Sequence, residues 1–253
     1  MEGMVCVKGL SKHYNKGKNN ELIVLSDISF TVTAGEFIAL FGPNGCGKSS
    51  MLNILGALDR DYHGIVKIMG KAPAVEHSGI VFQNFDESLF PWFNLLDNAT
   101  FGLRMLGVNK NERNAIGMQT LTMLGLDKYR YFYPYQISGG MKQKTCIARA
   151  LCGEKKLLLL DEPFSALDSA TKILLDEELT QICENKSFAT VLVSHDIDEI
   201  LMLADRLVML SAIPTTVRHV IDIELPRPRT RKLMMTKEYI SLKSFIMNEF
   251  IGI

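Results

Sequence analysis

The hydrophobic pattern of this chain alternates between short apolar runs and longer amphipathic segments. The short runs favour strands at 5–7, 28–32, 37–41, 65–69, 80–82, 157–160, 190–193, 206–210 and 217–225. The longer segments, broken at Gly107 and at Tyr133-Pro134, favour helices at 95–106, 112–124, 141–151 and 169–184. Two further sets of residues have the spacing of an amphipathic helix, namely Ile197, Ile200, Leu201 and Ala204, and then Met235, Tyr239, Leu242 and Ile246. The pattern predicts an α/β domain at 1–225 with a helical insertion at about 89–152, followed at 226–253 by a linker and an amphipathic helix.

A glycine-rich loop links the strand at 37–41 to an apolar helix start. The loop, Gly42-Pro43-Asn44-Gly45-Cys46-Gly47-Lys48-Ser49-Ser50, fits the phosphate-binding pattern G-x-x-x-x-G-K-[ST]. Glycines let successive backbone N–H groups point at phosphate oxygens, and the N-terminus of the helix adds partial positive charge. We expect Lys48 to reach the β- and γ-phosphates and the Ser49 hydroxyl to bind Mg²⁺. The loop therefore predicts nucleotide binding.

Two carboxylates follow the apolar strand at 157–160. Asp161 and Glu162 are expected at the carboxyl edge of a parallel sheet, beside the phosphate loop, because that is where such sheets bind ligands. There Asp161 would hold Mg²⁺ through water, and Glu162 would act as general base on the water that attacks the γ-phosphate. The alternative is a strand followed by an ordinary charged turn.

A second anion-binding feature is predicted at Ser138-Gly139-Gly140, where serine and two glycines open a helix. A hydroxyl and free N–H groups would face outward there, at the positive end of the helix dipole. Taken alone, this segment would be an ordinary helix cap.

Composition narrows the class of protein. The 253 residues carry 28 Lys and Arg and 28 Asp and Glu, so no nucleic-acid partner is expected, and the basic cluster at 227–232 is interpreted as a solvated linker. No apolar stretch approaches the roughly 18 residues of a membrane span, and the N-terminus does not resemble a signal peptide. The five scattered cysteines favour reduced thiols in the cytosol. Cys46 lies inside the phosphate loop, so we expect its alkylation to block nucleotide binding.

Together these motifs make the chain resemble the ATP-binding subunit of an ABC transporter. The resemblance begins near Val5 and runs to the end of the chain, and the motifs occur in the family's order. They are the Walker A loop at 42–49, the Q-loop residue Gln83, the signature at 138–143, Walker B at 157–162, the D-loop at 165–168 and the switch residue His195. The resemblance implies a P-loop NTPase core with an antiparallel β subdomain and an inserted α-helical subdomain.

The resemblance also implies a role for each motif. Two copies would trap ATP between the Walker A loop of one and Ser138, Gly139 and Gly140 of the other. Gln83 would bind Mg²⁺ or the attacking water and sense the membrane partner. His195 would contact the γ-phosphate and hold Glu162, and Tyr14 would stack on adenine. Taken singly, Gln83 could be a surface residue after a strand, His195 a turn residue and Tyr14 an edge-strand aromatic.

Within the family, the segment Phe90-Pro91-Trp92 resembles importers of the nitrate, sulfonate and taurine group. The chain departs from the usual pattern at Lys142 and Lys144, which keep the charge of arginine without its bidentate geometry, and at the insert Asp86-Glu87-Ser88. These departures remove no residue that hydrolysis needs.

We therefore interpret the chain as the ATP-hydrolysing subunit of an importer, peripheral to the cytoplasmic face of the cell membrane. It would bind ATP and Mg²⁺, pair with a second copy, dock on a separate integral-membrane permease, and serve a solute-binding protein indirectly. The alternatives are an ABC ATPase outside transport, an exporter subunit, and a module that senses ATP without turnover. The helical segment that follows Gln83, at 90–106, is the candidate docking surface, although Phe90 and Trp92 could equally pack on the core.

Overall fold

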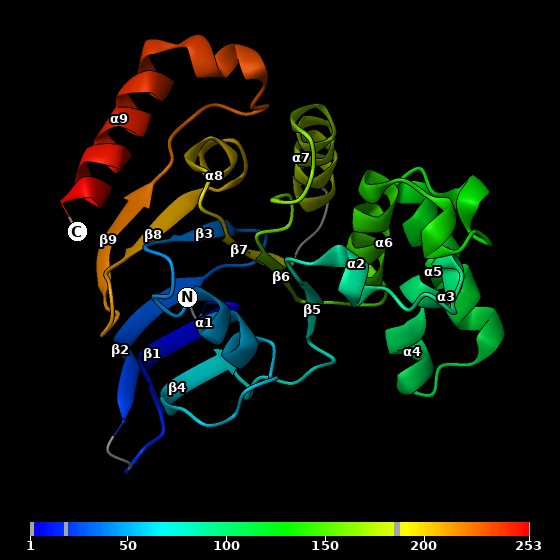
Figure 1. Cartoon of the computed structure of the whole chain (residues 1–253), viewed down its shortest axis with the longest axis horizontal. Coiled ribbons are helices and arrows are strands. Elements are labelled where there is room, and N and C mark those ends of the chain that lie inside the picture. Colours follow the sequence, from blue (N-terminus) through cyan, green and yellow to red (C-terminus); the bar gives the residue numbers. More distant parts are fainter. Residues whose placement is uncertain (1–2, 18–19, 185–187, 253) are drawn as a thin grey trace.

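The computed structural model describes residues 3–17, 20–184 and 188–252 (Figure 1). Within these ranges the chain forms a six-stranded sheet, ordered β5-β6-β7-β3-β8-β9, and a three-stranded sheet, ordered β2-β1-β4. The strands are β1 (Val5–Tyr14), β2 (Leu22–Val32), β3 (Phe37–Phe41), β4 (His63–Ile68), β5 (Ser78–Val81), β6 (Leu157–Asp161), β7 (Ala189–Val193), β8 (Arg206–Leu210) and β9 (Val217–Asp222). The α-helices are α1 (Lys48–Leu55), α2 (Phe85–Ser88), α3 (Leu95–Ala99), α4 (Phe101–Met105), α5 (Lys110–Met123), α6 (Gly139–Leu151), α7 (Ser169–Glu184), α8 (Ile197–Leu203) and α9 (Lys237–Ile251). The 3₁₀ turns of the described residues are η1 (Asp127–Tyr129), η2 (Pro134–Gln136) and η3 (Arg231–Met235).

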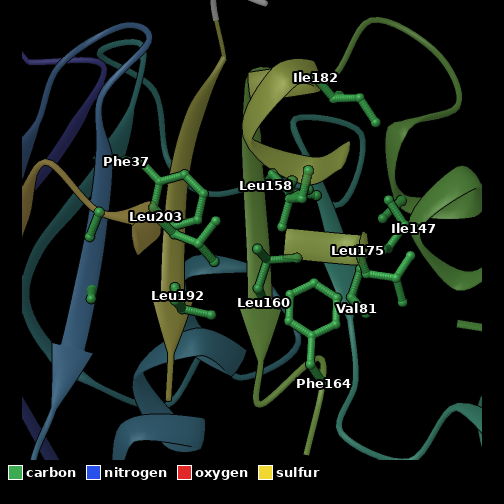
Figure 2. Close-up of a cluster of buried hydrophobic side chains, with 14 of the residues drawn as sticks. Phe37, Val81, Ile147, Leu158, Leu160, Phe164, Leu175, Ile182, Leu192 and Leu203 are labelled. Atoms are coloured by element: carbon green, nitrogen blue, oxygen red, sulfur yellow. The ribbon is translucent and has the colours of Figure 1, made fainter. Parts of the chain in front are cut away.

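The larger sheet is covered on both faces, which explains its continuous apolar runs. Strands β5, β6, β7, β3 and β8 pair in parallel, and β9 closes one edge antiparallel. Along β6, Leu157 and Leu159 point toward α1 and the smaller sheet, whereas Leu158 and Leu160 point toward α7. Figure 2 shows this second side, where Phe164 and Leu175 pack against Leu160. Parallel pairing brings the carboxyl ends of these strands to the same edge.

The smaller sheet is more extensive than the apolar pattern predicts. β1 reaches Tyr14 instead of ending at residue 7, and β2 starts at Leu22. The pairing between them contains register shifts, and Gly9 and Asp27 at the irregularities have positive φ angles of 60° and 53°. Bulges break the strict alternation of polar and apolar residues, so periodicity alone misses these strand halves.

The helical insertion lies between β5 and β6, beside the β5 edge of the sheet and away from α9 (Figure 1). The single helix predicted at 95–106 is wrong, because the chain forms α3 and α4 with Thr100 between them. The Thr100 hydroxyl donates to the Leu96 carbonyl at 2.7 Å, and the backbone leaves helical geometry at Thr100 with φ −93° and ψ 4°. Such back-bonding by threonine competes with the regular helix ladder. The Q-loop insert, which carried no helix prediction, forms the short helix α2.

The C-terminal segment is bound to the core more closely than a solvated linker would be. Arg229 is 6% exposed, and its guanidinium donates to the carbonyl oxygens of Leu201, Ala204, Ile223 and Leu225. The expectation of a solvated cluster at 227–232 is therefore wrong at Arg229, because a charge can be buried when its donors are satisfied.

The terminal helix α9 runs back over the sheet. Phe250 packs on Phe41 with ring centroids 4.6 Å apart, and Tyr239 is 1% exposed and donates from its hydroxyl to Asp198 at 2.8 Å. Met235, predicted on the buried face of this helix, is 85% exposed in η3, because the helix begins only at Lys237 with Thr236 as its N-cap.

We expect Arg229→Met to lower the free energy of unfolding by about 2–4 kcal/mol, because it leaves several buried carbonyl groups without donors. Chemical denaturation measures this loss. The matched control is Arg231→Met, two residues away and exposed, which should change stability by less than about 0.5 kcal/mol. Equal losses in the two variants would contradict the anchoring role of Arg229.

Candidate functional site

The phosphate loop curls around its own lysine at the carboxyl end of β3. Lys48 is 6% exposed, and its Nζ donates to the carbonyl oxygens of Gly42 at 2.8 Å and Pro43 at 2.9 Å. Gly47 precedes α1 with a φ of 97°, and a Cβ there would lie 2.6 Å from Cγ1 of Val24. Only glycine fits this position, both because of the left-handed backbone and because β2 lies directly behind it.

A cavity of about 390 Å³ opens in front of this loop. Its lining comes from the two sheets and from the loop between them: Tyr14, Leu22, Val24, Asn44, Gly45, Gly47, Lys48, Ser49, Ser50, Gln83, Asp161, Glu162 and Val193. The cavity thus joins the predicted Walker A, Walker B and Q-loop residues to the predicted stacking tyrosine. Of the predicted loop residues, Gly42, Pro43 and Cys46 are not part of this lining, and the carbonyl oxygens of Gly42 and Pro43 accept from Lys48.

Tyr14 stands at the end of β1, at the rim of the cavity. Its side chain is 39% exposed, and its hydroxyl lies 3.0 Å from Oγ of Ser50. The ammonium of Lys12 lies 5.0 Å from the ring centroid. Leu22 and Val24 on the paired strand add an apolar wall that the sequence analysis did not identify, because the start of β2 itself was missed.

Asp161 is the last residue of β6 and lies close to the loop. Burial raises the pKa of its carboxyl group, and so does the neighbouring charge of Glu162, whereas a hydrogen bond from Ser49 and the charge of Lys48 act in the opposite direction. A partly desolvated carboxylate beside a hydroxyl is a pair of hard oxygen ligands. Ser49 and Asp161, both predicted for the metal, are thus brought together.

Glu162 accepts from Gln83 and lies beside His195 at the cavity edge. Its Oε2 lies 3.0 Å from Nε2 of Gln83 and 3.2 Å from Nδ1 of His195. Gln83 follows β5 and His195 follows β7, so three neighbouring strands deliver the three groups. Glu162 has a φ of 44°, an unfavourable conformation for a residue with a side chain, and its N–H is held by the Val193 carbonyl at 2.9 Å.

The serine and glycines predicted as a second anion cradle lie elsewhere. Ser138 caps α6 by accepting from the Met141 N–H at 3.3 Å, and none of residues 138–140 is among the described residues that line the cavity at Lys48. Phe85 lies behind Gly139, and a Cβ on Gly140 would lie 2.6 Å from Cγ2 of Thr171. The two predicted anion-binding features therefore lie at separate places in one copy of the chain.

Comparison with known proteins identifies the family. The family model for ABC transporters matches residues 25–165. An uncharacterised ABC transporter ATP-binding protein of Methanocaldococcus jannaschii is 39% identical over 236 residues, covering 92% of this chain and 87% of that protein. The aliphatic sulfonates import ATP-binding protein SsuB of Bacillus licheniformis is 38% identical and covered to 96% in both chains. The bicarbonate transport ATP-binding protein CmpC of Synechococcus elongatus is 39% identical, but this chain spans only 38% of its length.

A solved structure supports the same conclusion. The dimeric ABC transporter cassette MJ0796 matches with a TM-score of 0.74 and 29% identity, over 88% of this chain and 100% of that one, and it is also known as a dimer bound to ADP and Pi after hydrolysis. The chain belongs to the ATP-binding protein family of ABC transporters, and it is an ATPase of this class. The fold and the family predicted from the motifs are confirmed.

We expect Cys46 to resist alkylation in the folded protein. Its side chain is 1% exposed, and burial raises the pKa of its thiol although Lys48 opposes the shift, so little thiolate forms near neutral pH. Peptide mass spectrometry after iodoacetamide treatment should find Cys6 and Cys183, both half-buried, modified before Cys46. Denaturant should abolish the difference, whereas rapid labelling of Cys46 in the native protein would contradict it.

Proposed function

We propose that this chain is the ATP-hydrolysing subunit of an ABC importer. It works as a pair of copies at the cytoplasmic face of the membrane, beneath a separate permease. The observation that carries the proposal is the convergence of Lys48, Asp161, Glu162, Gln83 and His195 at one sheet edge. Among the described residues, no helix combines the length and apolar character needed to cross a membrane.

The solute class follows from the relatives. The names of relatives specify import of aliphatic sulfonates, taurine and nitrate, and transport of bicarbonate. These solutes share a small anionic or zwitterionic head. We assign a solute of this type to the permease and to its solute-binding protein, and not to the ATPase.

The residues of the cavity divide the work of binding ATP. Lys48 and the N–H groups of the loop hold the β- and γ-phosphates, since the lysine already lies within the curl of the loop. The exposed Tyr14 ring is placed to stack on adenine, and Leu22 and Val24 exclude water beside it.

The oxygen donors of Ser49, Asp161 and Gln83 suit Mg²⁺, which would neutralise charge on the phosphates when bound. The described residues contain no cluster of three or more His, Cys, Asp or Glu that could hold a metal alone. A single carboxylate matches Mg²⁺, which keeps several waters and is completed by phosphate oxygens. Asp161 and Ser49 would therefore bind the metal, and the carboxylate of Glu162 would be available to bind the attacking water.

Glu162 acts as general base, taking a proton from the water that attacks the γ-phosphate. Its strained backbone and its two side-chain partners hold the carboxylate in one orientation. The His195 side chain is 60% exposed, so it is accessible to contact the γ-phosphate. Gln83 adds a hydrogen bond to Glu162, which would form or break when the helical insertion moves.

Two copies complete the site. The signature segment at 138–140 does not line the Lys48 cavity of its own chain, so we assign it to the nucleotide of a second copy. The N–H groups at the start of α6, a helix of 13 residues, would bind the γ-phosphate across the seam. Loss of that phosphate then weakens the pair and reopens it.

We expect Glu162→Gln to retain ATP binding and to lower kcat by at least about 100-fold, because it removes the general base and leaves Lys48 in place. Phosphate release and nucleotide titration measure the two properties separately. In excess ATP the variant should accumulate as a dimer in sedimentation. Wild-type turnover by the variant would reject both the assigned base and the proposed mechanism.

The helical insertion supplies the surface for the permease. Trp92 is 66% exposed, and it lies against Phe90 and Phe93 with ring centroids 5.6 and 6.2 Å apart. Arg104 lies 5.7 Å from the Phe93 ring centroid, so the cluster is apolar with a cationic rim. Such a patch on a helical insertion that follows Gln83 fits an amphipathic helix of a membrane protein.

We expect Trp92→Ala to weaken co-purification with the permease by at least about tenfold, because a large aromatic anchor is lost. Basal ATPase activity should remain, since Trp92 lies outside the cavity at Lys48. Leu58→Ala, which removes another exposed apolar side chain outside the insertion, is the control and should bind normally. If the Trp92 variant assembled with the permease normally, the docking surface would not include Trp92.

A further inference from the structure

The start of α7 joins the signature segment to the D-loop. Thr171 donates to Asp168 twice, from its N–H at 3.0 Å and from its hydroxyl at 2.6 Å. The Thr171 methyl group also stands behind Gly140, where a Cβ would approach it to 2.6 Å. A shift of the signature segment therefore meets the first turn of α7 directly.

The next residue, Lys172, reaches in the opposite direction, toward α8. Its Nζ lies 2.5 Å from Oδ2 of Asp196 and 3.4 Å from Oε2 of Glu199. Burial alone would lower the pKa of the Lys172 ammonium, but the carboxylates of Glu199 and Asp196 outweigh it and raise the pKa. Lys172 is thus a fixed positive charge between two carboxylates.

The two carboxylates also fix the residues on either side of His195. Glu199 binds Ser194, and Asp196 is the residue that follows His195. Ser194, 1% exposed, donates to Oε2 of Glu199 at 2.5 Å and accepts from the Asp196 N–H at 3.0 Å. Asp196 also caps α8 by accepting from the N–H groups of Asp198 and Glu199. The exposed His195 ring is therefore aimed at Glu162 by a backbone that is fixed on each side of it.

We propose that Lys172 is a positioning residue for hydrolysis, which sets His195 through Asp196 and Glu199 and ties it to the signature segment through Thr171. The signature segment serves one nucleotide of the dimer and His195 serves the other, so Lys172 lies on a path between the two sites. This inference rests on the proposed function, because it assumes that His195 acts in hydrolysis.

A purely structural ion pair is the competing explanation. Glu199 is 4% exposed, so removing its cationic partner will also cost stability. The experiment therefore needs kinetic constants of the folded protein, which a loss of stability alone does not change. It also needs a second variant that keeps the fold. Asp196→Asn provides the latter, because asparagine still caps a helix while it loses the charge that pairs with Lys172.

We expect Lys172→Met and Asp196→Asn each to lower kcat by about tenfold or more, with KM for ATP nearly unchanged, because the cavity at Lys48 is left intact while His195 is misplaced. Lys172→Arg should recover most of the rate, because it keeps the charge. Lys144→Met is the matched control. The Lys144 side chain is 22% exposed, close to the 20% of Lys172, and it also pairs with a carboxylate, that of Glu178 at 2.7 Å. A control with the same loss of kcat would overturn the proposal.

A double-mutant cycle with His195→Ala decides whether Lys172 acts through His195. If it does, Lys172→Met has little further effect once His195 is gone. Independent, multiplicative losses would overturn the inference and leave the proposed function standing. Full activity of the His195→Ala single variant would instead refute the role of His195 in the proposed function.

Discussion

The carboxyl edge of the parallel sheet is the constraint on which the site depends. β5, β6, β7 and β3 are buried on both faces, and their parallel register ends them side by side. Gln83, Glu162, His195 and the phosphate loop each follow one of these strands within a few residues. Their spacing is therefore fixed by backbone hydrogen bonds in the core, where packing leaves little freedom. This explains how the Glu162 carboxylate can be shared by two side chains that come from different loops.

The two predicted anion-binding features are separated in space, and this separation bears on the proposed mechanism. The cavity at Lys48 opens on the sheet edge, whereas the Ser138 cap of α6 belongs to the helical insertion beside β5. In the proposed mechanism, one chain supplies the catalytic residues at Lys48, and its Ser138 cap is left for the nucleotide of another copy. A related cassette is known as a dimer, and in such a dimer the Ser138 cap of one copy could bind the nucleotide held by the other. Under the proposed function, nucleotide occupancy and association of the copies would be one equilibrium, linked by the γ-phosphate.

The motifs could be predicted from the sequence because each carries its own local chemistry. The loop at 42–49 needs glycine backbone and one lysine, and a continuous apolar strand that ends in Asp161 and Glu162 specifies both burial and position. The contacts that the sequence did not reveal are long-range and polar. Arg229 belongs to a basic cluster in the sequence and becomes buried only because four carbonyl groups converge on it. Lys172 is one of many helical lysines until α8 places Asp196 beside it. The boundary between 225 and 226 and the roles of the site residues remain predictions.

The unusual insert after Gln83 connects the insertion to the signature helix. Asp86 on α2 pairs with Lys142 on α6 at 2.6 Å, and the Arg149 guanidinium binds the Ser88 carbonyl and hydroxyl oxygens. The first pair is exposed and contributes little by itself, but Phe85, 6% exposed, packs behind Gly139 and removes apolar surface from water. The segment after Gln83 and the signature segment should therefore move as one body. Gln83 lies at the border of that body, where its amide meets Glu162. In the proposed mechanism, a displacement that begins at Trp92 would therefore reach Glu162, the proposed general base, and the nucleotide of the partner copy in the same movement.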